Sequence, residues 1–181
     1  FRRITMSNEK SNGMTRRKFI GNVTMTAAAF SIVPRNVLGG KGYVAPSDKL
    51  NIAIIGAGGK GRSDMWSVAT ENIVALCDVD DRKIKETFEK TREEEDKQEL
   101  ADKLEKLPVY KDFREMLDKQ TDIDAVTIST PDHTHAAAAA YAMRRGKHVF
   151  VQKPLTHSVG EARILNKIAK EMGVITQMGN Q

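Results

Sequence analysis

Residues 51–62, NIAIIGAGGKGR, decide the fold that the sequence predicts. Gly56, Gly58 and Gly61 form the pattern G-x-G-x-x-G directly after an apolar run and at the start of a helical pattern. The pattern is weak alone but specific when an acidic residue also ends the next strand about 20 residues later. Asp78 supplies that acid, 22 residues after Gly56. The combination predicts a turn that binds a dinucleotide.

Each residue of this motif has a physical role in such a turn. Gly56 allows the tight turn, Gly58 lets the backbone approach a pyrophosphate, and Gly61 lets the helix pack closely on the strand. Free N–H groups at the helix N-terminus bind phosphate. Asp78 is expected to accept hydrogen bonds from the ribose hydroxyls and to repel a 2′-phosphate, which favours NAD over NADP. A glycine turn without a ligand is the alternative.

Two more residues of the turn, Gly59 and Lys60, are expected to contact the cofactor. Lys60 and the nearby Arg62 also keep NADP open as the less favoured cofactor, because a basic residue near the turn can accommodate a 2′-phosphate.

The rest of the chain alternates short apolar runs with helical patterns. Runs that are apolar on both faces, with helices between them, predict a parallel sheet covered on both sides. We therefore expect a Rossmann-type, doubly wound α/β fold. The expected strands are 50–56, 72–78, 108–110, 123–130, 148–152 and 174–179, and the expected helices are 59–70, 81–92, 112–119, 133–145 and 159–172.

Local signals predict where several of these helices begin and end. Asp112 and Glu115 have the spacing of a capping box, and Asp132 is expected to cap the next helix. Gly146 is expected to end that helix. Residues 81–106 are rich in charge and predict a solvated helix extended by an insertion.

Charge and cysteine content exclude several classes of function. Residues 1–46 hold eight basic residues and one acidic residue, so the net charge of +5 arises there and the remainder carries −2. Nucleic acid is therefore not expected as a partner. Cys77 is the only cysteine of the sequence, which excludes an intrachain disulfide and a CxxC metal site; it is expected to be a core residue. His133 and His135 do not share a helical face, and no metal site is predicted.

The N-terminal segment resembles an export signal. TRRKFI, residues 15–20, resembles a twin-arginine motif, and an uncharged stretch of 14 residues follows at 20–33. That stretch is shorter than the roughly 20 residues that span a bilayer but suits a signal peptide. Without a cysteine after it, no stable membrane anchor is expected. Export to the periplasm is the prediction, and a disordered basic tail on a cytoplasmic protein is the alternative.

These features divide the chain into three parts. Residues 1–13 are expected to be an upstream, disordered segment, 14–46 the signal peptide and linker, and 47–181 the NAD(P)-binding domain. The chain begins at Phe1 and stops in an apolar run, so we expect it to be part of a longer protein.

The domain resembles the glucose–fructose oxidoreductase/inositol dehydrogenase/MocA family over about residues 48–181. The resemblance is carried by the motifs GAGGKGR, ALCDVD, ISTPDHTHAAAAAYAMRRGKHVFVQKPL and VGEARIL. It implies that a C-terminal substrate domain, which holds the catalytic histidine, is absent from this chain.

The resemblance also implies roles for individual residues. Thr130, Pro131 and His135 would line the middle of the cofactor. Lys153, of the family's E-K-P motif, would lie near the nicotinamide ribose and the substrate and act in catalysis. Gln152 stands where the family has Glu. The peptide bond between Lys153 and the proline after it is expected to be cis. The alternative to a catalytic role for Lys153 is a lysine that merely extends to solvent.

Three functions follow from this resemblance. The first is an NAD-dependent oxidoreductase that transfers a hydride to or from a sugar or cyclitol hydroxyl. The second is a glycosidase of the same fold that oxidises its sugar transiently, and the third is a non-catalytic, sugar-responsive binding protein. The full-length protein is expected to be a homo-oligomer.

Overall fold

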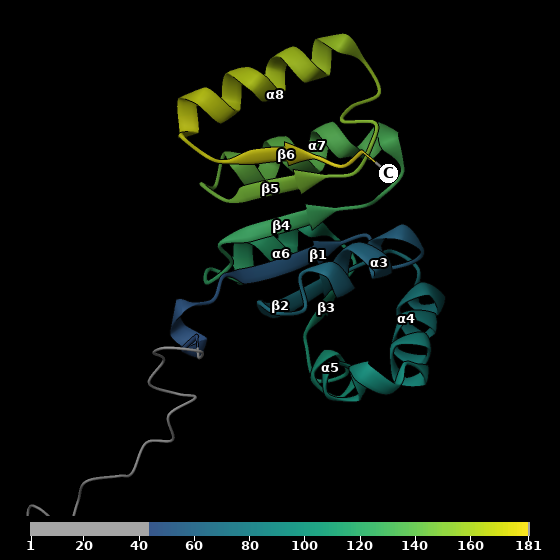
Figure 1. Cartoon of the computed structure of the whole chain (residues 1–181). Helices are drawn as coiled ribbons and strands as arrows, with labels where there is room; N and C mark the ends of the chain where they lie inside the picture. The colour runs from purple at the N-terminus through teal and green to yellow at the C-terminus, as the bar shows by residue number, and fades with distance from the viewer. Residues whose placement is uncertain (1–43, 181) are drawn as a thin grey trace, which may run out of the picture. The chain divides into compact units, whose positions relative to one another are not determined.

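The computed structural model describes residues 44–180, which form one six-stranded, wholly parallel sheet (Figure 1). The strand order is β3-β2-β1-β4-β5-β6, which reverses between β1 and β4 as expected for a doubly wound fold. The strands are β1 (Asn51–Ile55), β2 (Asn72–Cys77), β3 (Val109–Tyr110), β4 (Ala125–Ile128), β5 (His148–Val151) and β6 (Thr176–Met178). The Rossmann-type sheet is confirmed, whereas the predicted segment 1–13 and the signal motif lie outside the described residues.

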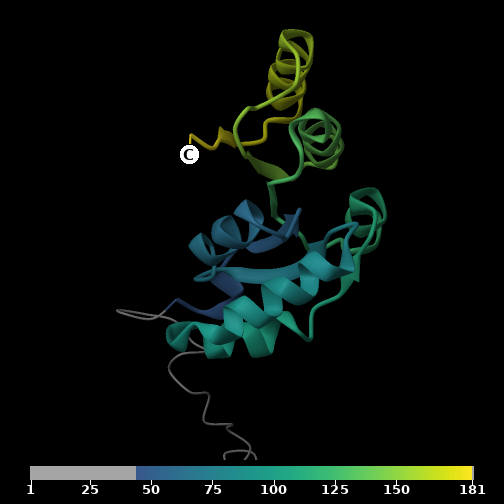
Figure 2. The same ribbon diagram turned by 90° about the vertical axis from the view of Figure 1, so that its right-hand side faces the viewer.

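Helices cover both faces of the sheet (Figures 1 and 2). One face packs against α3, α4 and α5, and the other against α6, α7 and α8. None of the helices within residues 44–180 is long and apolar enough to cross a bilayer. The bounds are α3 (Lys60–Ser67), α4 (Asp81–Glu93), α5 (Gln98–Leu104), α6 (Phe113–Lys119), α7 (Asp132–Met143) and α8 (Val159–Met172), with 3-10 turns η1 (Pro46–Asp48) and η2 (Glu95–Lys97).

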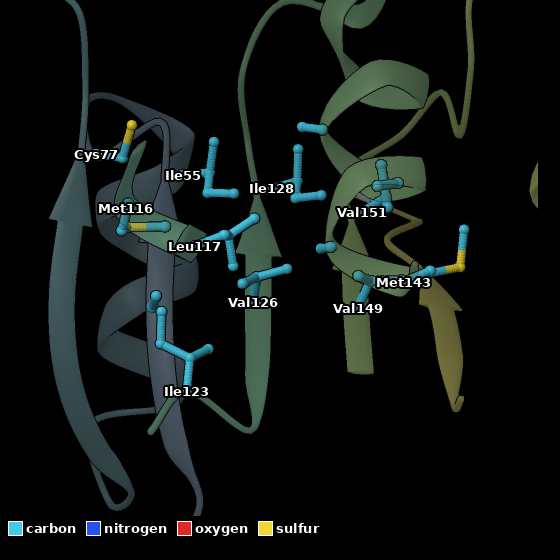
Figure 3. Close-up of a cluster of buried hydrophobic side chains, with 14 of the residues drawn as sticks. Ile55, Cys77, Met116, Leu117, Ile123, Val126, Ile128, Met143, Val149 and Val151 are labelled. Atoms are coloured by element: carbon cyan, nitrogen blue, oxygen red, sulfur yellow. The ribbon is translucent and has the colours of Figure 1, made fainter. Parts of the chain in front are cut away.

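The central strands have no solvated face, which explains their unbroken apolar sequences. In β1, Ile52 and Ile54 pack toward α3 and α4, whereas Ala53 and Ile55 pack toward α6 and α7. Figure 3 shows the second of these cores, in which side chains from β1, β4 and β5 meet those of α6 and α7. Both cores bury large apolar side chains, so the central strands are anchored from two sides.

The structure corrects the prediction for residues 81–106. The helix predicted at 81–92 is present as α4, which ends at Glu93, but the insertion after it is not simply solvated: the chain becomes extended at Glu94 and a separate helix α5 follows. Ala101 and Leu104 of α5 are fully buried, and Leu104 belongs to the core beneath α3 and α4. The many charged residues of this segment led to the prediction of a solvated structure, although α5 has a short apolar face.

The helix boundaries are partly as predicted. Asp112 caps α6 by accepting a hydrogen bond from the backbone of Arg114, but Glu115 pairs with Lys119, so no capping box forms. Gly146, with a φ of 73°, follows the end of α7 as expected.

Two caps differ from the prediction more clearly. The N-cap of α7 is Pro131, and Asp132 is instead the first residue of the helix. The complete capping box lies at α8, where Ser158 and Glu161 exchange side-chain hydrogen bonds with each other's backbone.

Truncating Leu104 tests whether α5 is part of the core. Leu104→Ala is expected to lower the free energy of unfolding by about 2–5 kcal/mol, because it leaves a cavity beneath α4. Lys103→Ala, at an exposed neighbouring position, is the control and is expected to have little effect. Urea denaturation measures both, and equal small losses would mean that α5 is a solvated appendage.

Candidate functional site

A cavity of about 800 Å³ lies at the carboxyl ends of the strands, where the strand order reverses. Ligands of open α/β sheets bind at this point. The cavity is lined by the glycine turn after β1, by the residues after β2, and by the loop after β4. The lining includes Gly56, Gly58, Gly59, Asp78, Thr130 and Pro131.

The glycine turn has the geometry that its sequence predicts. Gly56 has a φ of 83°, and a Cβ there would lie 2.8 Å from the carbonyl group of Ser129. A Cβ at Gly61 would lie 1.7 Å from the carbonyl oxygen of Gly56. Helix α3 can therefore begin directly against the turn only because both positions lack side chains. Its N-terminus is left beside the cavity, which suits a phosphate group.

Asp78 connects the end of β2 to this turn. Its Oδ2 atom accepts hydrogen bonds from the backbone of Ala57 at 3.0 Å and of Gly58 at 3.4 Å, and its Oδ1 atom accepts one from Asp80. A carboxylate has about four acceptor positions, so capacity remains for ribose hydroxyls. Asp78 thus both holds the turn and faces the cavity.

The basic residues of the cavity differ from those proposed from the sequence. Lys60 pairs with Asp64, and Arg62 pairs with Glu86; neither lines the cavity. The expected cofactor contact of Lys60 is therefore not seen in this arrangement.

The cations that do line the cavity are Lys83, Lys111 and Arg114. Each has an acidic partner, so no lysine or arginine among these three is left without a counter-charge. These residues follow β2 and β3 and lie outside the glycine motif, so the motif does not indicate them. The only sequence feature that points to them is their position shortly after strands that end at the cavity.

His135 was expected to line the cofactor, but its side chain does not line this cavity. Its side chain is 1% exposed and lies behind the cavity wall. Its ring nitrogens lie 2.7 Å from the carbonyl oxygens of Thr130 and Pro154. His135 therefore joins the loop after β4 to the loop after β5, and it shapes the site without facing it.

Lys153 is exposed and follows β5, next to the strands that carry the cavity. It does not line the cavity itself. The Lys153–Pro154 peptide bond is cis, as expected. The structure thus brings the glycine turn, Asp78, Thr130 and Pro131 together, and it leaves Lys153 at the neighbouring strand end; its role in catalysis stays a prediction.

Cys77 lies at the floor of the cavity and is 4% exposed. Burial, and then the negative charge of Asp78, raise the pKa of its thiol to about 12. At neutral pH the group is therefore a thiol, and it serves as a small core residue, as predicted, not as a nucleophile.

A buried polar cluster beside the cavity was not predicted. Asp64 of α3 accepts hydrogen bonds from Ser129 and Gln152 and an ion-pair contact from Lys60. Lys60 lies four residues before Asp64 on the same helix, whereas Ser129 and Gln152 lie 65 and 88 residues away, so no local sequence pattern predicts those two contacts.

Comparison with known proteins agrees with this geometry. Residues 50–180 match the Gfo/Idh/MocA family, described as an oxidoreductase family with an NAD-binding Rossmann fold. Over 57 residues the chain is 47% identical to the scyllo-inositol 2-dehydrogenase (NAD(+)) of Bacillus subtilis, covering 32% of this chain and 17% of the relative.

Two further relatives match more of the chain. The alpha-N-acetylgalactosaminidase of Shewanella oneidensis is 32% identical over 150 residues, which cover 77% of this chain and 31% of the relative. The crystal structure of GenD2 from gentamicin A biosynthesis, in complex with NAD, superposes with a TM-score of 0.59 at 26% identity, covering 82% of this chain and 37% of that one.

The chain spans between 17% and 37% of the length of these three relatives. The shared region is the one that carries the glycine turn, Asp78 and the six-stranded sheet, and NAD is its cofactor. Because the match covers residues 50–180, the chain belongs to the Gfo/Idh/MocA oxidoreductase family and contains that family's NAD-binding Rossmann domain.

Proposed function

We propose that the full-length protein is an NAD-dependent oxidoreductase that transfers a hydride between its cofactor and a sugar or cyclitol hydroxyl. The observation that carries the proposal is the 800 Å³ cavity at the switch point, bordered by the glycine turn and Asp78. The likeness to an inositol dehydrogenase supports the substrate class. On this proposal the chain supplies the cofactor half, and a C-terminal domain supplies the substrate half.

The residues of the cavity have separable tasks in this function. The N-terminus of α3 and the turn at Gly56–Gly58 hold the pyrophosphate, and Asp78 holds the ribose of the adenosine half. When bound, NAD supplies the nicotinamide ring that accepts the hydride. Thr130 and Pro131, from the loop after β4, contact its middle part.

Lys153 is the residue of this chain that we propose takes part in catalysis. An ammonium group beside the reacting hydroxyl stabilises negative charge on the oxygen as its proton leaves. It also lowers the pKa of a neighbouring base, which brings that base closer to the working pH. The exposed side chain at the end of β5 is free to reach such a substrate.

A glycosidase that oxidises its sugar transiently is the second candidate, favoured by the likeness to the Shewanella alpha-N-acetylgalactosaminidase. Net reduction of added NAD during incubation with free sugars or cyclitols distinguishes the two, because the glycosidase returns its hydride to the product. A binding protein without catalysis is the third candidate; it would neither reduce added NAD nor hydrolyse a glycoside.

The preference for NAD over NADP is the first test of the cavity. We expect the wild-type protein to bind NADH more tightly than NADPH, because Asp78 repels a 2′-phosphate. Asp78→Asn should weaken NADH binding by roughly ten-fold, the scale of a hydrogen bond to a charged group, and narrow the difference between cofactors. Fluorescence titration measures both affinities, with Glu89→Gln on the exposed side of α4 as control. Equal affinities in the wild type would remove the role given to Asp78.

Removing the charge of Lys153 tests its catalytic role. Lys153→Met is expected to leave NAD affinity within a few-fold and to lower kcat about 100-fold or more, the usual scale for a lost acid–base group. Lys170→Met, on the exposed face of α8, is the matched control. Steady-state kinetics of the full-length enzyme decide, and near-normal turnover would show that Lys153 is only a solvated lysine.

We further propose that the protein is exported to the periplasm by the twin-arginine route and assembles as a homo-oligomer. The motif TRRKFI at 15–20 supports export. Arg16→Lys combined with Arg17→Lys should retain a tagged full-length protein in the cytoplasm, as cell fractionation would show. Continued export of that variant would mean that the leader is not a twin-arginine signal, whereas a wild-type protein that stays in the cytoplasm would favour the cytoplasmic alternative.

A further inference from the structure

Asp64 and Gln152 are two buried polar side chains that contact each other. Asp64 lies on α3, and Gln152 follows the carboxyl end of β5. They are 8% and 5% exposed. The side-chain nitrogen of Gln152 donates to both carboxylate oxygens of Asp64, at 3.0 and 3.1 Å. Ser129, after β4, donates its hydroxyl to the same carboxylate at 2.7 Å. Helix α3 is thereby tied to the ends of β4 and β5.

The other end of the Gln152 side chain holds the backbone of the next residue. Its Oε1 atom accepts a hydrogen bond from the N–H of Lys153 at 2.9 Å. The amide has one orientation that satisfies both ends, because a reversed amide would point its oxygen at the carboxylate and its NH₂ at an N–H group.

Gly179, the residue after β6, packs closely against this amide. A Cβ at Gly179 would lie 2.8 Å from the Oε1 atom of Gln152. The N–H of Gly179 donates to the carbonyl oxygen of Val151 at 2.7 Å, which holds the glycine against the amide. The Gln152 side chain thus lies between α3 and the residue after β6, at the wall of a cavity of about 410 Å³ that Lys60, Asp64 and Gly179 also line.

The charges around the pair explain why an amide occupies position 152. Asp64 already supplies a carboxylate, and Lys60 is the cation that contacts it, at 2.9 Å. Ser129 and Gly179, which also contact the pair, are uncharged. A second carboxylate at 152 would lie about 3 Å from the first, where like charges repel strongly in a buried site.

We propose that Asp64 and Gln152 form an acid–amide lock, one carboxylate and one amide, that positions Lys153 at the end of β5 for the reaction. In this lock Gln152 is a positioning residue, since it holds the backbone of Lys153 and does not reach the substrate. In this chain the residue before Lys153 is an amide, and the acid with which it pairs lies on α3. This inference rests on the proposed function.

Gln152→Glu in the full-length enzyme tests the lock through its pH dependence. At low pH the introduced carboxyl group keeps a proton and donates it to Asp64, as the amide does. As pH rises that proton is lost, the two carboxylates repel each other, and Lys153 is displaced. Relative to wild type, kcat should therefore fall roughly ten-fold between about pH 6 and about pH 9, with the KM for NAD changed much less.

The exchanged pair provides the decisive comparison. Asp64→Asn combined with Gln152→Glu restores one acid and one amide in reversed positions, so the extra fall in kcat at high pH should disappear. Gln120→Glu, at a site that contacts Tyr110 outside the cavity, is the control for an added negative charge and should follow the wild-type profile.

The outcomes separate the lock from the proposed function. A Gln152→Glu enzyme with the wild-type pH profile, or an exchanged pair as impaired as the single variant, overturns the lock. If the wild type turns over no sugar or cyclitol, the proposed function fails and the positioning role fails with it. The pairing is then judged by thermal unfolding, in which Gln152→Glu should lower Tm at high pH but not at low pH, and the exchanged pair should restore it.

Discussion

The site depends on how closely the backbone of helix α3 packs against the glycine turn. A Cβ at Gly61 would lie 1.7 Å from the carbonyl oxygen of Gly56, so the helix can start there only without side chains at the contact. This start places the helix N-terminus at the switch point between β1 and β4 and sets where Asp64 lies relative to the ends of the strands. The cofactor cavity and the buried cluster beside it both depend on this approach.

The fold could be predicted because its signals are local. Strands buried on both faces have continuous apolar sequences, as Ile52–Ile55 does, and the glycine motif identifies the first crossover. The error at α5 also has a local cause. Leu100 and Leu104 of α5 are four residues apart, as on one face of a helix, but this apolar pattern is too short to outweigh the surrounding charge.

The site could be predicted only in part, because some of its contacts join distant positions. The turn and Asp78 follow from a motif with fixed spacing. His135, in contrast, has a sequence position next to the cavity loop, yet its ring turns back to the carbonyl of Pro154. Asp64 and Gln152 are 88 residues apart, and nothing in the neighbourhood of either indicates the other. Such tertiary hydrogen bonds are decided by the packing of α3 against the sheet.

Cys77 gives the cofactor cavity a floor that is insensitive to oxidants. Oxidation of a cysteine begins from its thiolate, and a pKa raised to about 12 leaves almost none of that form at neutral pH. The side chain is also 4% exposed, which limits access by peroxide or by another thiol. Residues 1–181 contain no second cysteine. We therefore expect the covalent state of this part of the cavity wall to be the same in a reducing and in an oxidising compartment.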